Sequence, residues 1–365
     1  MKNDQYYMQL ALDLAASAKG KTNPNPLVGA VIVKDGSIVG TGLHRKAGEP
    51  HAEVHAFRMA GEHAKDATLY VTLEPCSHFG KTPPCANLVK ESGVKRVVVA
   101  MQDPNPSVAG RGINLLRDAG IEVAVAVLEK QARRLNERFI HNMLTSRPFV
   151  ISKFAMTLDG KIATYSGHSQ WITGEEAREN VHELRNEVDA ILVGIGTVLK
   201  DNPALTTRLK ERTCKNPIRI VLDRELRTPL NAQIVQTEEA KTILVTAEDQ
   251  QHKASAFENL GVELLYVPVI NSKLDLNAML DELYKRGITD ILVEGGGEVN
   301  ASFLRNGLIQ KFLVYVAPKV LGGRNSITPF TGDNVETIDA AMLLQFAEVD
   351  KIGEDLRITA YPKEG

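Results

Sequence analysis

Cysteine is scarce in this sequence, with three residues in a chain of 365. So few cysteines do not make a disulfide scaffold, and in a reducing compartment such cysteines more often bind a metal or act in catalysis. No run of 18 apolar residues occurs, so a membrane-spanning helix is not expected. The amphipathic stretch at the N-terminus contains Asp4 and Asp13, which argues against a signal peptide. We therefore expect a cytoplasmic protein without a membrane partner.

An excess of charge of either sign is also missing. The chain has 43 Lys and Arg against 45 Asp and Glu, for a formal charge of −2. A protein that binds nucleic acid usually carries a basic face, because neutralising phosphates drives its affinity. Near-neutrality therefore favours a small-molecule substrate over a nucleic acid.

Length and pattern predict two α/β domains. A chain of 365 residues exceeds one typical core, and a new strand begins at Phe149, directly after Arg147-Pro148. We therefore place the boundary near residue 147, giving domains 1–147 and 148–365. In the first, helices are expected at 1–20, 51–61, 84–92, 112–119 and 129–144, and strands at 28–33, 37–42, 68–73, 95–100 and 121–127. In the second, strands are expected from 149 and at 190–193, 218–222, 242–245, 264–267, 290–293 and 312–316, and helices at 175–188, 274–286 and 299–306.

The first domain contains a His-x-Glu element followed by two Pro-Cys pairs. His51 and Glu53 come first, Cys76 follows after Pro75, and Cys85 follows after Pro84. A His/Cys/Cys site with a nearby Glu that is not a ligand is the pattern of zinc deaminases. One imidazole and two thiolates leave the fourth tetrahedral position to water, whose pKa on zinc falls to about 7. Glu53 can then carry a proton from the water to the departing amine.

Two features of this site leave alternatives open. Eight residues, rather than two, separate Cys76 from Cys85, so the cysteines could be two unrelated buried residues. His55 lies one helical turn after His51 and could replace one cysteine as a ligand. We prefer the His51, Cys76 and Cys85 set, because the upstream His-x-Glu element and a proline before each cysteine favour it.

Three polar residues flank the site. Asn25 opens the strand that leads into it and His44 ends the hairpin, so either could hydrogen-bond a heterocycle or be a plain turn residue. Lys81, between the two cysteines, could hold a substrate phosphate or be an ordinary surface lysine.

Two glycine-rich turns mark the second domain. Gly194-Ile195-Gly196 and Gly295-Gly296-Gly297 each follow an expected strand and open a helix, where backbone N–H groups can approach phosphates. Neither matches the G-x-G-x-x-G fingerprint, so a Rossmann domain is not indicated. On a nearby strand end and turn, Lys153 and Asp159 could orient a ribose.

The His51-Ala52-Glu53 element and the stretch from Thr72 to Cys85 resemble the riboflavin-biosynthesis pyrimidine deaminase family, which has this long cysteine spacing. The segments from Phe149 onward resemble the reductase domain of its bifunctional members. The resemblance implies a cytidine-deaminase-like three-layer domain followed by a dihydrofolate-reductase-like α/β domain, with zinc, NADPH and a homo-oligomer. It also implies deamination of 2,5-diamino-6-ribosylamino-4(3H)-pyrimidinone 5′-phosphate, a small phosphorylated pyrimidine, followed by reduction of its ribosyl group.

The same resemblance implies site residues in the second domain. Arg185 and Arg208 also suit phosphate by their chemistry, because a guanidinium forms paired hydrogen bonds with it. The implied NADPH contacts are Ala155, Trp171, Thr197, Asp201, Gly296, Gly297, Glu298, Val299, Asn300, Ala301 and Ser302. The implied substrate contacts are Ser169, Arg185, Leu205, Arg208 and Glu294.

Two other functions remain open at this point. One is a nucleoside or tRNA deaminase fused to an unrelated nucleotide-binding domain, which would favour a short cysteine spacing or a basic, aromatic-rich face. The other is a nucleotide-sensing regulator with a structural zinc, which would need His55 as a fourth ligand and would leave Glu53 without a role.

Overall fold

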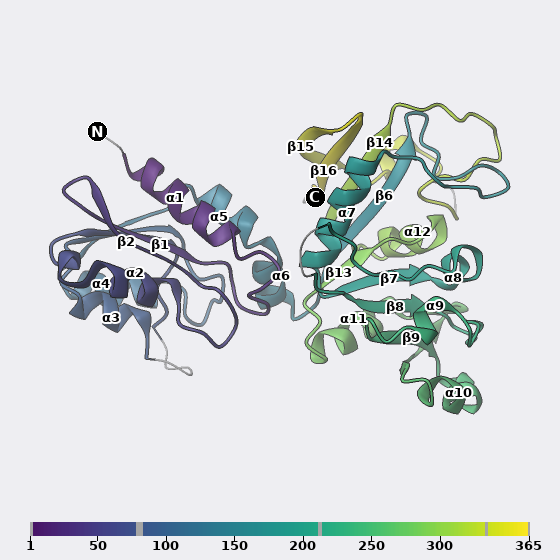
Figure 1. The fold of residues 1–365 in the computed structure, drawn as a ribbon, viewed down its shortest axis with the longest axis horizontal. Coiled ribbons are helices and arrows are strands. Elements are labelled where there is room, and N and C mark those ends of the chain that lie inside the picture. Colours follow the sequence, from purple (N-terminus) through teal and green to yellow (C-terminus); the bar gives the residue numbers. More distant parts are fainter. Residues whose placement is uncertain (1–2, 78–82, 211–213, 333–334, 364–365) are drawn as a thin grey trace. The chain divides into compact units, whose positions relative to one another are not determined.

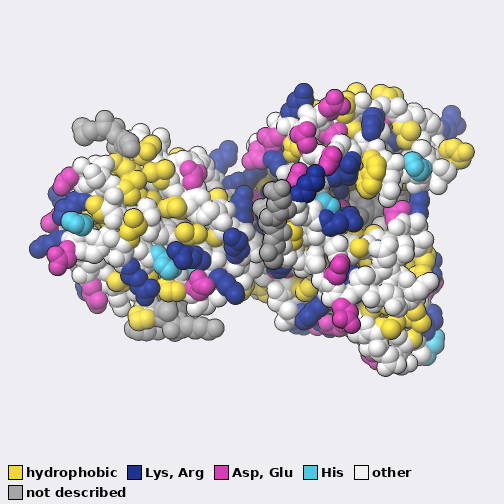
Figure 2. Space-filling model, viewed as in Figure 1, with side chains coloured by type: hydrophobic (Ala, Val, Ile, Leu, Met, Phe, Trp, Pro, Cys, Tyr) yellow, Lys and Arg dark blue, Asp and Glu magenta, His cyan; other side chains and the backbone are white. Residues whose placement is uncertain are grey.

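The computed structural model describes residues 3–77, 83–210, 214–332 and 335–363. These residues form two compact units, which meet in the sequence between Ser146 and Arg147 and are described separately here. No helix in the described ranges is long and apolar enough to cross a membrane. On the face drawn in Figure 2, acidic and basic side chains both occur over each unit, in keeping with the balanced composition.

The first unit is a five-stranded sheet between two layers of helices (Figure 1). Its strands are β2 (Ser37–Leu43), β1 (Gly29–Lys34), β3 (Thr68–Leu73), β4 (Arg96–Met101) and β5 (Glu122–Val125), in that order across the sheet. The expected hairpin turns at Asp35-Gly36, where both residues have positive φ, and β3, β4 and β5 run parallel. The carboxyl ends of β3 and β4 therefore lie at one edge of the sheet.

The helices of this unit cover both faces of the sheet, as expected for a three-layer domain. On one face lie α1 (Asp4–Ala16) and α5 (Glu129–Leu135), and on the other α2 (Ala52–Ala60), a 3₁₀ turn (Gly61–Ala64), α3 (Cys85–Glu91) and α4 (Arg111–Asp118). Helix α2 packs unusually close to β2. A Cβ on Gly42 would lie 2.1 Å from the Ala52 carbonyl oxygen, so only glycine permits this contact. This packing fixes the start of α2.

The prediction of a single helix at 129–144 is wrong, because two helices occupy this stretch. Asn136 ends α5 and precedes α6 (Glu137–Thr145), and its backbone has left the helical region. The buried side-chain amide of Asn136 accepts a hydrogen bond from the Leu27 N–H (2.8 Å) and donates one to the Leu27 carbonyl (3.0 Å). Pairing both backbone groups of Leu27 compensates for the break in the helix.

The second unit contains a nine-stranded sheet. Across the sheet the order is β10 (Glu263–Val267), β9 (Thr242–Ala247), β8 (Ile218–Leu222), β7 (Ala190–Gly194), β13 (Asp290–Val293), β6 (Phe149–Thr157), β14 (Lys311–Ala317), β16 (Asp355–Pro362) and β15 (Leu344–Ile352). All strands from β10 to β14 are parallel, whereas β16 and β15 are antiparallel additions. Neither β15 nor β16 was predicted from the sequence. For β15 the reason is that it is an exposed edge strand with mixed polarity.

Alternate residues of the parallel strands pack on opposite faces of this sheet. Ile191 and Val193 of β7 face one apolar cluster, and Ala190 and Leu192 face the other. Because both faces are covered, these strands are almost uniformly apolar. The first face carries α7 (Glu175–Glu187), α8 (Ile195–Asp201), α9 (Gln233–Gln236) and α10 (Ala254–Glu258), and the second carries α11 (Leu276–Lys285) and α12 (Gly297–Arg305). Short elements complete the unit: β11 (Val269–Ile270), β12 (Lys273–Leu274) and 3₁₀ turns at Glu248–Lys253 and Ile338–Ala340.

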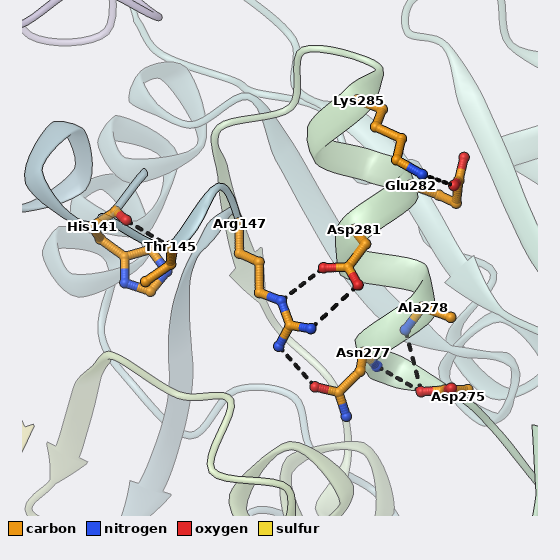
Figure 3. A network of polar contacts seen from close by, with 9 residues as sticks. All are labelled: His141, Thr145, Arg147, Asp275, Asn277, Ala278, Asp281, Glu282 and Lys285. Atoms are coloured by element: carbon orange, nitrogen blue, oxygen red, sulfur yellow. Dashed lines mark hydrogen bonds and ion pairs between the residues drawn. The ribbon is translucent and has the colours of Figure 1, made fainter. Parts of the chain in front are cut away.

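The second unit is anchored at its first residue. The guanidinium of Arg147 donates two hydrogen bonds to the Asp281 carboxylate, at 2.7 and 3.2 Å, and a third to the Asn277 side chain at 2.9 Å (Figure 3). Both partners lie on α11. This paired geometry is the strong form of an Arg–carboxylate contact, so the chain is fixed where β6 begins.

Asn136→Ala should destabilise the first unit by about 1–3 kcal/mol, because it leaves two backbone groups of Leu27 without partners. Amide hydrogen exchange measured on peptides of the full chain would show faster exchange in 24–34 and 129–145, with unchanged peptides in the second unit. Asn114→Ala, at an exposed position of α4, is the matched control. Equal exchange in wild type and Asn136→Ala would contradict this role.

Candidate active sites

Three side chains from three elements meet in the first unit, as the sequence predicted. His51 is the N-cap of α2, Cys76 follows the end of β3, and Cys85 is the first residue of α3. The Nδ1 atom of His51 lies 3.2 Å from Sγ of Cys85 and 3.6 Å from Sγ of Cys76. Among the described residues, these three form the group whose ligand atoms could hold a metal ion, and His55 is outside it.

The spacing of these atoms fits zinc. With Zn–S near 2.3 Å and Zn–N near 2.0 Å, a tetrahedral site separates its nitrogen and sulfur ligands by about 3.5 Å. The two measured N–S distances lie on either side of this value. Three protein ligands also leave one tetrahedral position open, which is typical of catalytic rather than structural zinc.

The two thiols influence each other strongly. The Cys85 thiol and the His51 ring hydrogen-bond to Sγ of Cys76 and lower its pKa to about 4. Cys85 shows the opposite shift, since the neighbouring Cys76 and burial both raise its pKa. One thiolate is therefore favoured by the protein itself, and a dication would stabilise the second.

Glu53 is buried beside this cluster. It lies in the first turn of α2, is 3% exposed and has the Cys85 thiol as a neighbour. Burial raises the pKa of Glu53 to about 7, against a smaller opposing effect of hydrogen bonding. A carboxyl group in this state can both accept and donate a proton.

A cavity of about 200 Å³ joins these groups. Asn25 and His44 both line it, whereas Lys81 lies outside the described residues. The cavity is lined by Asn25, Pro26, Val28, His44, His51, Glu53, Leu73, Glu74, Cys76, Asp103 and Phe139.

Asn25 and His44 form one polar unit. Nδ1 of His44 lies 3.2 Å from the Pro50 carbonyl oxygen and Nε2 lies 3.0 Å from the Asn25 amide nitrogen. Nδ1 must therefore carry the hydrogen, and Nε2 accepts from Asn25. Burial lowers the pKa of His44, which agrees with a neutral ring. The side-chain oxygen of Asn25 is then the acceptor that this pair can offer to a ligand.

Six of the lining residues were not predicted from the sequence, and three of them, Glu74, Asp103 and Phe139, are polar or aromatic. Phe139 comes from α6, which the analysis merged with α5, so the break that aims it at the cavity was not visible. Glu74 directly follows β3, and Asp103 lies two residues after the end of β4. Polar residues at the carboxyl ends of parallel strands are a signal that could have found both.

The second candidate site lies at the carboxyl ends of β13 and β7, beside the middle of the neighbouring strand β6. Lys153 was expected at a strand end but lies within β6, which continues to Thr157. The turn after β7 opens α8 and the turn after β13 opens α12, as expected from the two glycine runs. The Glu294 N–H donates to the Leu192 carbonyl (2.9 Å), so the two turns start side by side. Ligands of open α/β sheets bind in such a crevice.

A largely buried ion triad of Glu294, Arg185 and Lys153, with side chains 11–14% exposed, lies at this edge of the sheet. The Glu294 carboxylate accepts two hydrogen bonds from Arg185 (2.8 and 3.1 Å) and one from Lys153 (3.3 Å). Burial alone would raise the pKa of Glu294, but the charges of Arg185 and Lys153 outweigh it and hold the pKa well below its usual range. Three of the predicted substrate-binding residues are thus brought together.

His182 joins this group and was missed from the sequence. It lies one helical turn before Arg185 on α7, and its Nδ1 accepts a hydrogen bond from the Arg208 backbone N–H (3.2 Å). Burial, followed by the charges of Arg185 and Arg208, lowers the pKa of His182 to about 4. A neutral histidine therefore stands among cations, a setting suited to an anion.

The other residues predicted for this site differ in exposure and in their contacts. Trp171 is 61% exposed, with the Arg178 guanidinium 4.6 Å from its ring centre. Leu205 packs into an apolar cluster, and Asp159 accepts hydrogen bonds from the backbone of Leu321 and Gly322. Ser169 lies in the loop before α7, Ala155 on β6, and Thr197 and Asp201 on α8.

The predicted loop from Gly296 to Ser302 is mostly the first turns of α12. Asn300 and Ala301 are buried, and the Asn300 side chain donates to the Pro329 carbonyl (3.0 Å). Gly297 is also buried, while Gly296, Glu298, Val299 and Ser302 keep some exposure. The helix N-terminus can therefore meet a ligand through backbone N–H groups, with Asn300 holding the turn in place.

Comparison with known proteins agrees with the division into two domains of different kinds. Residues 1–101 match the cytidine and deoxycytidylate deaminase zinc-binding region, and residues 148–358 match the RibD C-terminal domain. Riboflavin biosynthesis protein RibD of Aquifex aeolicus is 49% identical over 97% of this chain and 97% of its own. The Escherichia coli protein of the same name is 44% identical over 97% of this chain and 98% of its own.

Solved structures give the same result. Acinetobacter baumannii RibD has a TM-score of 0.87 and 41% identity, with 99% of both chains covered. A Thermotoga maritima protein described as a diaminohydroxyphosphoribosylaminopyrimidine deaminase and 5-amino-6-(5-phosphoribosylamino)uracil reductase has a TM-score of 0.86 and 39% identity over 99% of both chains. Fold and sites thus define an enzyme with a zinc-binding deaminase domain followed by a reductase domain.

The chain belongs to the RibD family of bifunctional deaminase–reductases of riboflavin biosynthesis. The predicted fold class, a cytidine-deaminase-like domain followed by a dihydrofolate-reductase-like domain, is confirmed. The alternative of a deaminase fused to an unrelated nucleotide-binding domain is wrong, because the second half matches the RibD C-terminal domain.

The ion triad predicts a pH-dependent stability. The folded-state pKa of Glu294 lies below that of an exposed glutamate, about 4.3. Its stabilising effect is therefore complete above that pH and is lost as the pH falls toward the folded-state pKa. Glu294→Gln should lower the free energy of unfolding by about 3 kcal/mol at pH 7, because two buried cations lose their partner.

Urea unfolding followed by far-UV circular dichroism, at pH 7 and below pH 4, would measure this effect. The difference between wild type and Glu294→Gln should shrink at the lower pH. Glu298→Gln, at an exposed position in the first turn of α12, is the matched control and should change each value by less than about 1 kcal/mol. A difference that grows on acidification would contradict the assigned charge state.

Proposed function

We propose that the first domain (1–147) deaminates 2,5-diamino-6-ribosylamino-4(3H)-pyrimidinone 5′-phosphate and that the second (148–365) reduces the product with NADPH. Hydrolysis would release the 2-amino group as ammonia, and hydride transfer to C1′ of the opened ribosyl group would give 5-amino-6-ribitylamino-uracil 5′-phosphate. The observation that carries this proposal is the His51, Cys76 and Cys85 cluster with Glu53 at one cavity. Membership of the RibD family supports the substrate.

In the first domain, His51, Cys76 and Cys85 would hold zinc, and Glu53 would move the proton. Zinc, when bound there, supplies a Lewis acid that activates water near neutral pH. Glu53 lies beside Cys85 and on the cavity wall, so its carboxyl group can take a proton from water and return it to the departing amine. Asn25, oriented by His44, would accept a hydrogen bond from the pyrimidine, and Lys81 would bind the substrate phosphate.

In the second domain, the two glycine turns would bind NADPH and the ion triad would bind the substrate. The N-terminus of α12 favours a cofactor phosphate, and exposed Trp171 offers an aromatic face. We assign the cofactor contacts to Ala155, Trp171, Thr197, Asp201 and residues 296–302. Arg185, Arg208 and Lys153, ordered by Glu294, would hold the phosphorylated sugar, with Ser169 and Leu205 beside it. The cofactor would supply the hydride, and the protein would supply position and charge.

The proposed binding partner is therefore a small phosphorylated pyrimidine, and we propose no nucleic-acid or membrane partner. The proposed location is the cytoplasm. Thiolate ligands such as Cys76 and Cys85 persist in a reducing compartment, which supports this location.

We also propose a homo-oligomer that assembles through the β15 edge. This strand has no neighbour on its outer side among the described residues, and Phe346 and Val349 on it are 69% and 59% exposed. An edge strand has unpaired backbone N–H and C=O groups, and this one also carries exposed apolar side chains, so it can pair with another chain. A second copy would cover it symmetrically.

Glu53→Gln should retain one zinc per chain and lose ammonia release by roughly 10²–10⁴-fold, the usual contribution of a general acid–base. Metal analysis and an ammonia assay on the diaminopyrimidinone would measure both. Glu62→Gln, at an exposed position next to α2, is the matched control. NADPH oxidation with the deaminated substrate should be unchanged in both variants and should survive zinc removal. Full ammonia release by Glu53→Gln would overturn the assignment.

Phe346→Glu should convert the oligomer to single chains, because a charge would be buried at the paired edges. Sedimentation velocity on the full chain measures the mass. Leu260→Glu places the same charge at another exposed leucine and should leave the mass unchanged. Unchanged mass in Phe346→Glu would show that this edge is not the interface.

A further inference from the structure

Glu74 is a second carboxylate on the wall of the deaminase cavity, and the proposed proton transfer does not use it. It directly follows β3 and precedes the Pro75-Cys76 pair, and it is 5% exposed. A buried carboxylate is costly unless its oxygens are hydrogen-bonded. The partners of Glu74 therefore indicate its role.

Four backbone N–H groups donate to this one carboxylate. One oxygen accepts from Asp103 (3.2 Å) and Gly110 (2.9 Å), and the other accepts from Gly112 (2.8 Å) and Ile113 (3.2 Å). All four donors lie in the segment that connects β4 to α4 and in the first turn of α4. An ionised carboxylate has about four acceptor positions, so these contacts use all of them.

Helix α4 depends on this contact because it has no cap of its own. Its N-cap is Gly110, which has no side chain to accept the first N–H groups of the helix. Gly112 and Ile113 are the second and third residues of α4, and their N–H groups are bound by Glu74. A distant carboxylate thus replaces the usual local cap, with a favourable charge at the helix N-terminus.

The segment also packs directly on the turn that carries the metal ligand. A Cβ on Gly112 would lie 2.1 Å from the Pro75 carbonyl oxygen and 3.2 Å from Oε1 of Glu74. At its other end, the segment begins with Asp103, which lines the cavity. Movement of the segment would therefore move a wall of the cavity that His51 and Cys76 also line.

We propose that Glu74 is a positioning residue of the deaminase: it fixes the 103–113 segment, and with it Asp103, as the substrate-binding wall of the cavity. The inference rests on the proposed deaminase function for its catalytic consequence, though not for the structural contact. Glu74 does not act as a second proton carrier, because backbone N–H groups occupy both of its oxygens. The expected defect on its removal is thus in substrate binding rather than in the chemical step.

Glu74→Gln tests this in the full-length, zinc-loaded enzyme. The amide offers one oxygen and turns its NH₂ group against two N–H donors. KM for ammonia release should rise roughly tenfold or more, since losing one hydrogen bond to a charged group accounts for such a factor. The kcat value should change by less, and NADPH oxidation with the deaminated substrate should be unchanged. Hydrogen exchange in peptides covering 103–113 should become faster.

Two further variants complete the experiment. Glu62→Gln, on the exposed 3₁₀ turn of the same domain, should match wild type in every measurement. Glu74→Asp keeps the charge but is one methylene too short to reach all four donors. It should therefore also raise KM and speed hydrogen exchange in 103–113, and it replaces Glu74→Gln in the test if that variant does not fold.

Each outcome decides the proposal. Unchanged KM together with unchanged exchange in 103–113 would overturn it, and a fall in kcat alone would place Glu74 in the chemical step instead. If wild type releases no ammonia from the diaminopyrimidinone, the proposed function has failed. The exchange of 103–113 in Glu74→Gln then still decides whether Glu74 holds this segment.

Discussion

Parallel strand pairing is the interaction on which both sites depend. Parallel neighbours end at the same edge of a sheet, so residues that are distant in the sequence follow their strands into one place. In the first domain this brings the residues after β3 next to those after β4. In the second it brings the ends of β13 and β7 together, beside Lys153 in the middle of β6. The antiparallel strands β2 and β15 lie at sheet edges and are not part of either site. Strand β2 packs against α2, and β15 forms an exposed edge.

Three glutamates at these sites show how surroundings decide the role of one side-chain type. Glu53 is buried with few donors, so its pKa rises and it can exchange a proton. Glu294 is buried between two cations, so it stays ionised and orders them. Glu74 is bound by backbone N–H groups and fixes a segment of chain. For Glu53 and Glu294 burial acts in the same direction on the pKa, and the neighbouring groups determine which protonation state the protein favours.

Much of this could be predicted from the sequence, because some signals are local. The His51-x-Glu53 element and the two Pro-Cys pairs indicate the metal cluster without knowledge of the fold. The glycine turns indicate where helices begin after strands. Other features depend on distant partners. The break at Asn136 exists because that side chain pairs with Leu27, 109 residues away, and nothing in the helical pattern of 129–144 reveals it. Phe139 was missed for the same reason.

The edge strand β15 was missed for a different reason, since an exposed strand need not show the apolar alternation that reveals buried strands. The resemblance of this region to a known family gave its function but not its strand boundaries.

Glu74 and Glu294 occupy equivalent places, and the comparison explains why they differ in use. Each directly follows a strand, and each donates its N–H to a carbonyl of the parallel neighbour, Met101 in one case and Leu192 in the other. The partners of Glu74 are backbone groups, which cannot leave without moving the chain. The partners of Glu294 are the long side chains of Arg185 and Lys153, which can change rotamer without moving the chain. A strand-end carboxylate bound by backbone N–H groups thus fixes a segment of chain, whereas one bound by side-chain cations orders those side chains alone.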